Sequence, residues 1–382
     1  MNTNFTTHQN HPLIEREQTY FLEKKHVTIH SEDRDICKWP NSNQFEVTLP
    51  KDLTNIISIR LVDITLPSNT YTFSNDNQNT KFRIEVSPQI NSTNPDLVLE
   101  YNALEAYYNN FDYYEVTIDD GYYTPEQLAI EIQNKLNRTI TTTLENNGYT
   151  LPTGYAYDDF IVKYNPATHK IEFINNRDHF TLLFTQEITY ETSCGVKNVW
   201  CQPIKWGFPY YLGYEKKDYA GLINLGTYYI DSINFSVQPS THKAVDHVYY
   251  TKPENVLNID SDDVIYMELD KYNNIDEIEP YSHLTNNAIS NDYAGKTNSA
   301  FAKIPISFDQ FTKKFLTKTY ELNNVTSFKV PLQKVRKLKF KFRYHDGRLV
   351  DFKNQNFNFT IEACELIDEQ ARYKIINNVY CD

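Results

Sequence analysis

Apolar and polar residues alternate along most of this chain, as they do in strands that bury one face. Clear runs of this kind lie at 45–49, 82–86, 160–164, 265–269 and 338–344. Between 56 and 66 the apolar positions change phase, which predicts a β-bulge or a strand that passes between two sheets. The chain shows no repeat of fixed period. We therefore expect a mainly β fold, a jelly-roll-like antiparallel β-sandwich built from one or two sandwiches.

One segment carries the signals of an amphipathic helix near residues 124–138. Thr124 suits the N-cap, Pro125 suits the first helical position, and Gln127 completes a capping box. Apolar residues then recur at every fourth position, at 128, 132 and 136. The resulting apolar face predicts packing against a sheet.

Other stretches are less periodic. Residues 88–111 favour a loop with weak strand character at 97–99, and residues 271–299 favour a long polar loop. The aromatic stretch 200–214 ends in a short apolar element, 212–214, which we expect to pack against the core.

Composition shifts too little along the chain to fix sharp domain boundaries. We expect a flexible N-terminal arm at 1–25, a β-sandwich domain with the inserted helix at 26–225, a second β-sandwich portion at 226–365 and a C-terminal tail at 366–382. Long polar loops should connect the strands.

The acidic net charge and the composition limit the classes of protein to which this chain can belong. The net charge of −13 makes a basic nucleic-acid coat unfavourable, because a polyanion would be repelled at long range. Hydrophobic residues form 40% of the chain and aromatic residues 14%, enough for a sizeable core. No run of uncharged apolar residues is long enough to predict a transmembrane helix, and residues 1–10 do not resemble a secretory signal.

Catalytic signatures are missing from the sequence. Neither phosphate-binding glycine loops nor G-x-S-x-G, H-E-x-x-H or C-x-x-C motifs occur. Asp33 and Asp35 lie on one side of a strand end and have the chemistry to hold a metal, although a salt-bridged turn with Arg34 is the more usual arrangement. The acidic run 260–263 lacks the glycine and distant glutamate of a calcium loop. We expect no enzyme activity, no metal site and no cofactor.

One strand predicts a binding face. Four cations alternate there with four apolar or aromatic residues: Lys337, Lys339, Lys341 and Arg343 against Leu338, Phe340, Phe342 and Tyr344. Charges of this kind often keep an exposed sheet face soluble. The alternative is a contact with an acidic partner, which would be a neighbouring subunit, lipid headgroups or a genome. Aromatic residues, which would favour base stacking, are missing from the cationic face.

Aromatic residues offer two further interpretations. The 30 tyrosines, several in adjacent pairs such as Tyr107-Tyr108 and Tyr210-Tyr211, exceed what a core of this size needs, and tyrosine is enriched in protein interfaces. The three tryptophans, Trp39, Trp200 and Trp206, are candidate platforms for sugar rings. Burial of all three would exclude that use.

Several motifs, in this order, resemble a known family. They are S-E-D-R-D at 31–35, P-N-S-N-Q-F at 40–45, the apolar strand 56–67, Y-T-F at 71–73, G-Y-Y-T-P-E-Q-L at 121–128, Y-L-G-Y at 211–214, D-G-R-L-V-D-F at 346–352 and N-F-N-F-T at 356–360. Together they resemble minor capsid and other virion structural proteins of giant nucleocytoplasmic large DNA viruses. The resemblance covers most of residues 26–365.

That resemblance implies a structural function. The family consists of β-sandwich subunits that lie beneath or between major capsid proteins, and no catalytic residues carry over. We therefore expect a non-enzymatic minor capsid subunit of a large icosahedral double-stranded DNA virus, made in the host cytoplasm and located in the virion. Its partners would be the major capsid protein and other minor capsid proteins, with inner-membrane or genome contact through the cationic strand, and no small-molecule substrate. The alternative is a glycan-binding or glycan-cleaving β-sandwich of the virion surface.

Overall fold

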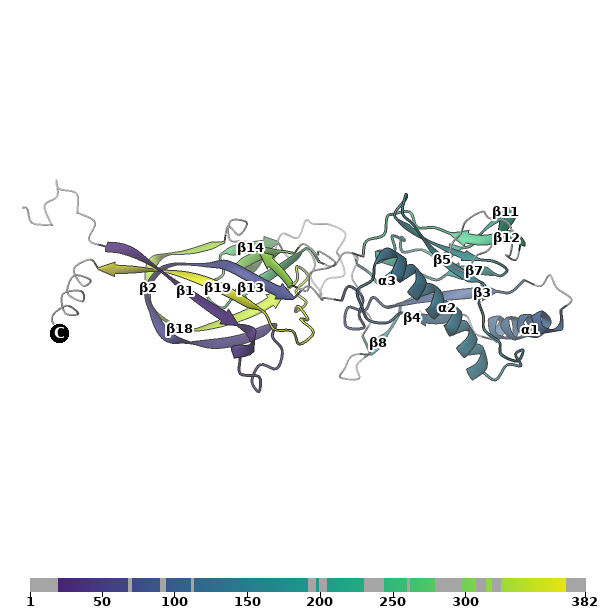
Figure 1. The fold of residues 1–382 in the computed structure, drawn as a ribbon, viewed down its shortest axis with the longest axis horizontal. Coiled ribbons are helices and arrows are strands. Elements are labelled where there is room, and N and C mark those ends of the chain that lie inside the picture. The colour runs from purple at the N-terminus through teal and green to yellow at the C-terminus, as the bar shows by residue number, and fades with distance from the viewer. Residues whose placement is uncertain are drawn as a thin grey trace, which may run out of the picture. The chain divides into compact units, whose positions relative to one another are not determined.

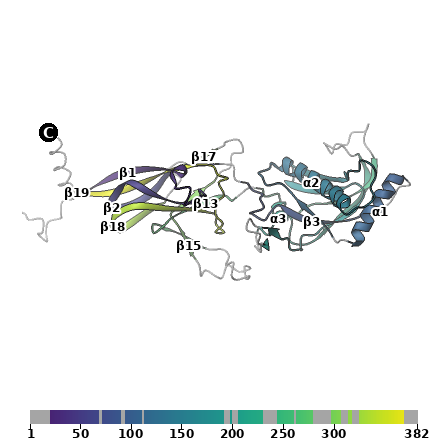
Figure 2. The same ribbon diagram turned by 90° about the horizontal axis from the view of Figure 1, so that it is seen from below.

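The chain forms two compact units in the computed structural model (Figures 1 and 2). Unit 1 consists of Met1–Thr70 with Asp262–Asp382, and unit 2 of Tyr71–Ser261. The structure describes residues 20–67, 71–89, 94–110, 113–191, 197–198, 205–229, 244–259, 262–278, 297–306, 314–317 and 324–368. Unit 2 is thus inserted into the sequence of unit 1. This division differs from the boundary expected near Gly226, which lies inside strand β11 (Leu222–Tyr229).

A seven-stranded antiparallel sheet forms most of unit 1 as described. Its order is β1-β19-β2-β18-β13-β16, and β17 also pairs with β2. The strands are β1 (Tyr20–His30), β2 (Gln44–Pro67), β13 (Val264–Leu269), β16 (Ala302–Pro305), β17 (Lys314–Thr317), β18 (Val325–Arg343) and β19 (Asn358–Asp368). A short 3₁₀ helix, η1 (Ser31–Asp33), follows β1, and β14 (Ile275–Ile278) pairs with β15 (Thr297–Ala300). All strand pairs described in the chain are antiparallel, which confirms the mainly β, antiparallel fold.

Strand β2 runs without a break through Pro50, where the pattern predicted a strand end. Proline is tolerated there because the register between β2 and β18 shifts around it, so no ladder partner requires its missing N–H. The phase change predicted near residue 62 is confirmed. Asp63 pairs with Thr360 and Leu61 with Ile361, so Val62 is the extra residue of a β-bulge.

The core of unit 1 combines aliphatic side chains with a cluster of aromatic rings on this sheet. Phe340, Phe342, Phe357 and Phe359 pack mainly edge to face, with ring centroids 4.9–6.3 Å apart. Phe45 of β2 joins them at 5.6 Å from Phe340. Edge-to-face packing is the geometry that aromatic quadrupoles favour.

Strand β1 begins within the segment expected to be an arm, and β19 extends into the segment expected to be a tail. Tyr20–His30 form β1, which pairs along its whole length with Asn358–Asp368 of β19. Residues 20–25 therefore belong to the sheet and not to an arm, and residues 366–368 belong to it and not to a tail. The pattern missed the N-terminal extension because charged residues (Glu23, Lys24 and Lys25) interrupt the apolar alternation.

Unit 2 is a β-sandwich of two four-stranded sheets. One has the order β10-β7-β3-β4 and the other β11-β12-β6-β5. The strands are β3 (Lys81–Ser87), β4 (Tyr114–Thr117), β5 (Phe160–Asn165), β6 (Lys170–Asn175), β7 (His179–Leu182), β10 (Tyr219–Ala220) and β12 (Ala244–Thr251), besides β11; the short pair β8 (Tyr190–Glu191) and β9 (Lys197–Asn198) lies outside these sheets. Phe82 contacts Phe173 and Phe160 contacts Phe180 across the two sheets.

The predicted helix is confirmed as α2 (Pro125–Asn146), with both hydrogen bonds of the capping box present. It extends eight residues beyond the predicted end, and Ile140 and Leu144 continue its buried face. Its polar side chains also cover the free edge of β5. Asn137 accepts a hydrogen bond from Phe160 N and donates one to Phe160 O, and Gln133 accepts one from Val162 N. The helix thereby protects a sheet edge that would otherwise be open to pairing.

The loop predicted at 88–111 is wrong over most of its length. Helix α1 (Pro95–Asn110) forms there, with Glu100, Ala103, Leu104 and Tyr107 on its buried face. These positions have helical spacing, but a glutamate takes the place of an apolar residue. The pattern was therefore too weak to predict the helix.

The short apolar element expected at 212–214 does pack against the core of unit 2. It follows helix α3 (Phe208–Tyr211), and Leu212 is fully buried. Gly213 has a φ of +88°, and a Cβ there would lie 2.4 Å from the carbonyl oxygen of Asn255. This close approach requires glycine.

Candidate functional site

The cationic strand predicted as a binding face lies in β18, and we call Lys337, Lys339, Lys341 and Arg343 the basic strand face. Its opposite side is buried: Leu338, Phe340 and Phe342 are at most 2% exposed. Lys337, Lys339 and Lys341 lie on the other side of the strand from these buried residues, as the alternation predicts. The cations differ, however, in their environment and partners.

Carboxylates of the same sheet pair with the lysines at the two ends of the row. Lys337 Nζ lies 2.9 Å from Glu46 Oε1 on β2, and Lys341 Nζ lies 3.3 Å from Glu268 Oε2 on β13. The hydrogen bond from Lys337 holds the pKa of Glu46 below its usual value. Lys339 Nζ sits 5.5 Å from the centre of the Trp39 ring, a cation–π distance.

Arg343 belongs to the interior of unit 1. Its side chain is only 2% exposed and pairs with Glu268 at 2.5 Å and Glu277 at 2.8 Å. The guanidinium also lies over the ring of Tyr266. A partner molecule cannot reach this cation, so Arg343 is a structural residue of the sheet. The exposed part of the basic strand face is reduced to its three lysines.

The acidic motifs considered as metal sites serve as turns in the described structure. Arg34 donates hydrogen bonds to the carbonyl oxygens of Ser31, Trp39 and Pro40, and Asp35 accepts from the backbone of Cys37 and Lys38. In the acidic run 260–263, Asp262 pairs with Arg348, and residues 260–261 lie outside the described structure. The described residues contain no group of three or more His, Cys, Asp or Glu side chains placed to hold a metal ion.

A buried charge cluster in unit 2 was missed by the sequence analysis. Arg177, after β6, makes a bidentate pair with Glu100 of α1 at 2.7 and 2.9 Å. It also pairs with Asp178 at 2.9 Å and Asp159 at 2.8 Å. The four residues come from three distant segments and follow no motif, so only the fold brings them together.

This cluster holds three carboxylates around one guanidinium. Asp178 is fully buried, and Glu100 and Asp159 are each 7% exposed. Burial raises the pKa of Asp159 to about 6, and the nearby charges of Asp178 and Glu100 act in the same direction against the guanidinium of Arg177. Tyr157 donates a hydrogen bond to Asp178, and Tyr155 donates one to Glu100. The cluster is closed by its own hydrogen bonds and locks α1 to the sandwich.

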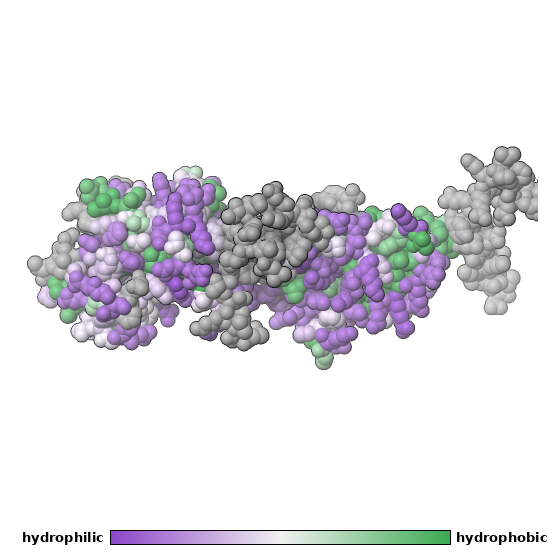
Figure 3. Space-filling view, turned by 180° about the vertical axis from the view of Figure 1, so that it is seen from behind, coloured by the Kyte–Doolittle hydropathy of each residue, from purple (hydrophilic) through white to green (hydrophobic). Residues whose placement is uncertain are grey.

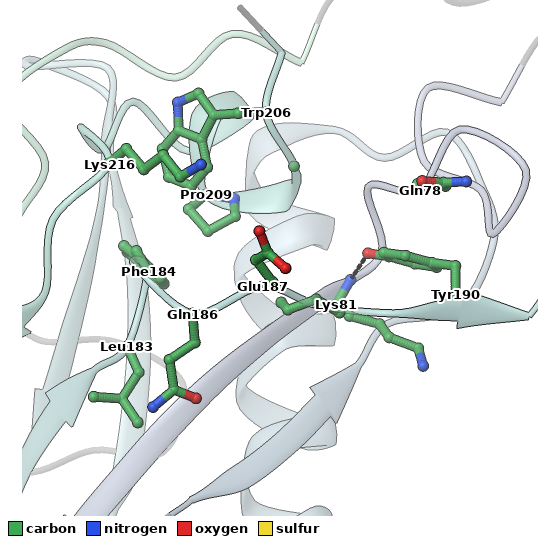
Figure 4. Close-up of a pocket in the computed structure, with 12 residues that line it drawn as sticks. Gln78, Lys81, Leu183, Phe184, Gln186, Glu187, Tyr190, Trp206, Pro209 and Lys216 are labelled. Carbon is green, nitrogen blue, oxygen red and sulfur yellow. Dashed lines mark hydrogen bonds between the residues drawn. The ribbon is translucent and has the colours of Figure 1, made fainter. Parts of the chain in front are cut away.

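A pocket on unit 2 contains one of the candidate sugar platforms (Figure 4). Its cavity volume is about 50 Å³, and its lining includes Trp206, Phe184, Glu187 and Gln78. Trp206 is half-buried. Trp39 is also half-buried, but its ring is occupied by Lys38 and Lys339 at 5.4 and 5.5 Å. Trp200 lies outside the described residues.

The surface of the described residues is mostly hydrophilic on the side shown in Figure 3, with smaller hydrophobic areas. Exposed aliphatic side chains include Leu222, Ile223 and Leu225 on β11, at 63%, 55% and 77% exposure. Of the tyrosine pairs, Tyr107-Tyr108 and Tyr210-Tyr211 each have one ring buried and one more exposed. None of the described helices is long and apolar enough to span a bilayer.

Comparisons with known proteins give one family and several distant structures. No curated protein matches this sequence. The mavirus penton protein, solved as a selenomethionine crystal structure, has a TM-score of 0.40 and 10% identity over 92% of this chain and 100% of its own. A chain of the Sputnik virophage, solved by cryo-EM, has a TM-score of 0.37 and 13% identity over 93% and 99%. The family model for DUF5901, a family of unknown function, matches residues 14–310, and the chain belongs to that family.

Proposed function

We propose that this chain is a non-enzymatic structural subunit of the capsid of a large icosahedral double-stranded DNA virus. More specifically, we propose a minor capsid protein that cements or scaffolds major capsid proteins and contacts other minor capsid proteins. It would be made in the host cytoplasm and assembled into the virion. The motifs that resemble virion structural proteins of giant viruses are the starting point of this proposal.

The observation that carries the proposal is the role of those motif residues in the fold. Arg34 joins three backbone carbonyls of one turn, Thr124 and Gln127 cap α2, and Leu212 fills the core beside the Gly213 turn. These motif positions build the scaffold, and within the described part of the chain none of them belongs to a cluster of metal-binding groups. Structural roles for these motif residues support a function that depends on shape and surface.

Two surface features support subunit contacts. Strand β11 is an outer strand of its four-stranded sheet as described, and it carries three exposed aliphatic side chains. Exposed apolar side chains on a strand that is open to pairing favour contact with another protein. The exposed lysines of the basic strand face provide a second contact for an acidic neighbour, membrane surface or genome. The ion pairs with Glu46 and Glu268 limit the strength of that second contact.

Co-purification with virus particles tests this function. Particles of the virus that encodes the chain are banded on a density gradient, treated with protease, washed at high salt and quantified by mass spectrometry. The proposal predicts a constant molar ratio of this chain to the major capsid protein through every step. Loss of the chain while the major capsid protein remains would contradict it. A non-structural viral protein serves as the control for carry-over.

A further inference from the structure

The pocket around Trp206 combines an aromatic wall with polar groups of both hydrogen-bonding types. In Figure 4, Trp206 and Pro209 lie on one side and Gln78 and Tyr190 on the other, and the carboxylate of Glu187 projects between them. Phe184 packs against Trp206 with ring centroids 6.4 Å apart and holds it from behind. The indole is therefore supported by the core and still partly exposed.

The side-chain oxygen of Gln78, which lines this pocket, lacks a hydrogen-bond donor among the described residues. The residue is only 6% exposed, and its Oε1 atom has no hydrogen-bond partner among the described residues. A buried carbonyl oxygen without a donor is energetically unfavourable. Gln78 also has a φ of +52°, so its backbone holds the side chain in an unusual position at the pocket. These features indicate that an external N–H or O–H group completes the site.

The remaining polar groups define the ligand further. Glu187 is exposed and offers two acceptor oxygens, while Lys216 is exposed and offers a donor beside Trp206 (Figure 4). Aromatic faces bind the C–H side of a sugar ring, and amide, carboxylate and ammonium groups bind its hydroxyls. A neutral sugar presents donors and acceptors together, which is what this mixture of groups requires.

We propose that this pocket binds a neutral sugar residue of a glycan, with the ring stacked on Trp206 and its hydroxyls bonded to Gln78 and Glu187. A volume of about 50 Å³ admits one edge of a sugar ring and leaves the rest in solvent. Glycoside hydrolysis generally needs a pair of carboxyl groups, and Glu187 is the only one among the twelve lining residues. The described lining therefore suits glycan binding. This inference adds an activity to the structural function and does not depend on it.

Saturation-transfer-difference NMR on the full chain tests the site. The probes are the methyl glycosides of glucose, galactose, mannose and N-acetylglucosamine, with the anionic methyl glycoside of N-acetylneuraminic acid for comparison. A ligand of about 13 non-hydrogen atoms in a shallow site should bind with a Kd of about 1 mM. We expect at least one neutral glycoside to bind with its C–H face closest to the protein.

Three variants distinguish an effect on ligand binding from an effect on folding. Glu187→Gln should weaken binding about 5- to 10-fold, because charge-assisted hydrogen bonds to the ligand are lost while the exposed position keeps a side chain of the same shape. Trp206→Ala should abolish detectable binding. Glu145→Gln, an exposed acid on α2 away from the pocket, is the matched control and should bind as the unchanged chain does.

Three outcomes would overturn the proposal. They are the absence of saturation transfer from every neutral probe at 10-fold the expected Kd, unchanged binding in Glu187→Gln, or binding of the anionic probe alone. Because Trp206 also packs against the core, the Glu187 variant decides the result if the tryptophan variant fails to fold.

Discussion

Replacing Arg177 should destabilise unit 2 more than any other single change of a charged residue in the described structure. Arg177→Met keeps an unbranched side chain against Tyr157, whose ring lies 5.7 Å from the guanidinium, but removes the cation. Three carboxylates, two at 7% exposure and one fully buried, then lie together without a counter-charge. Breaking a buried ion pair costs about 3–5 kcal/mol, because the remaining charge stays desolvated. We therefore expect the free energy of unfolding of unit 2 to fall by about 3–5 kcal/mol.

The cluster also predicts a pH dependence that one residue controls. The folded-state pKa of Asp159 is about 6, against an ordinary value of 3.8. A raised carboxyl pKa means that the folded state favours the protonated form. This contribution to stability is fully present below about pH 3.8 and is lost as the pH rises through about 6. About two pKa units correspond to a loss of roughly 3 kcal/mol at pH 7.5.

Asp159→Asn is the matched partner of this experiment, because it keeps the shape of the side chain and cannot ionise. Its unfolding free energy relative to the unchanged chain should rise by about 2–3 kcal/mol between pH 4 and 7.5. Pulsed hydrogen exchange with mass spectrometry across a urea series measures both variants in the full chain, and peptides from β5 and β6 report on unit 2. A loss below 1 kcal/mol in Arg177→Met, or a pH profile that Asp159→Asn leaves unchanged, would refute the reasoning.

Three further changes test other parts of the structure. Thr124→Ala removes the side-chain acceptor of the capping box and should lower the stability of unit 2 by about 1 kcal/mol in the same exchange experiment. Gly213→Ala drives a Cβ into the Asn255 carbonyl at positive φ, so we expect a loss of at least about 3 kcal/mol and poor soluble yield. Replacing Lys337 and Lys339 together by Ser should leave the fold intact and reduce salt-sensitive binding to anionic liposomes or DNA, if either is a partner; unchanged binding in flotation and filter assays would remove this pair of lysines from the contact.

Features set by local sequence were predicted well. The capping box at Thr124, the bulge near Val62 and the alternation along 337–342 all depend on neighbouring residues, and each is present. Local signals are sufficient there because hydrogen bonds and side-chain periodicity act within a few residues.

Features set by distant residues could not be predicted. Glu100 is buried on α1 only because Arg177, 77 positions away, neutralises it, so the helix lacked an apolar face in the sequence. Arg343 likewise looked like one of four equal surface cations until Glu268 and Glu277 enclosed it. The insertion of unit 2 follows from pairing of β2 with β18 and β19, which no local pattern encodes. The pocket was only partly foreseen: Trp206 was a candidate, but the partner Gln78 lies 128 positions earlier in the sequence.

A cryo-EM reconstruction of the virus particle tests the central claim most directly, because it shows whether this chain is built into the shell. We expect density for both units, in contact with capsid proteins over interfaces that together exceed the ~1,600 Å² of an ordinary stable complex. A complete shell at side-chain resolution with no density for this chain, while the protein occurs elsewhere in the infected cell, would contradict it.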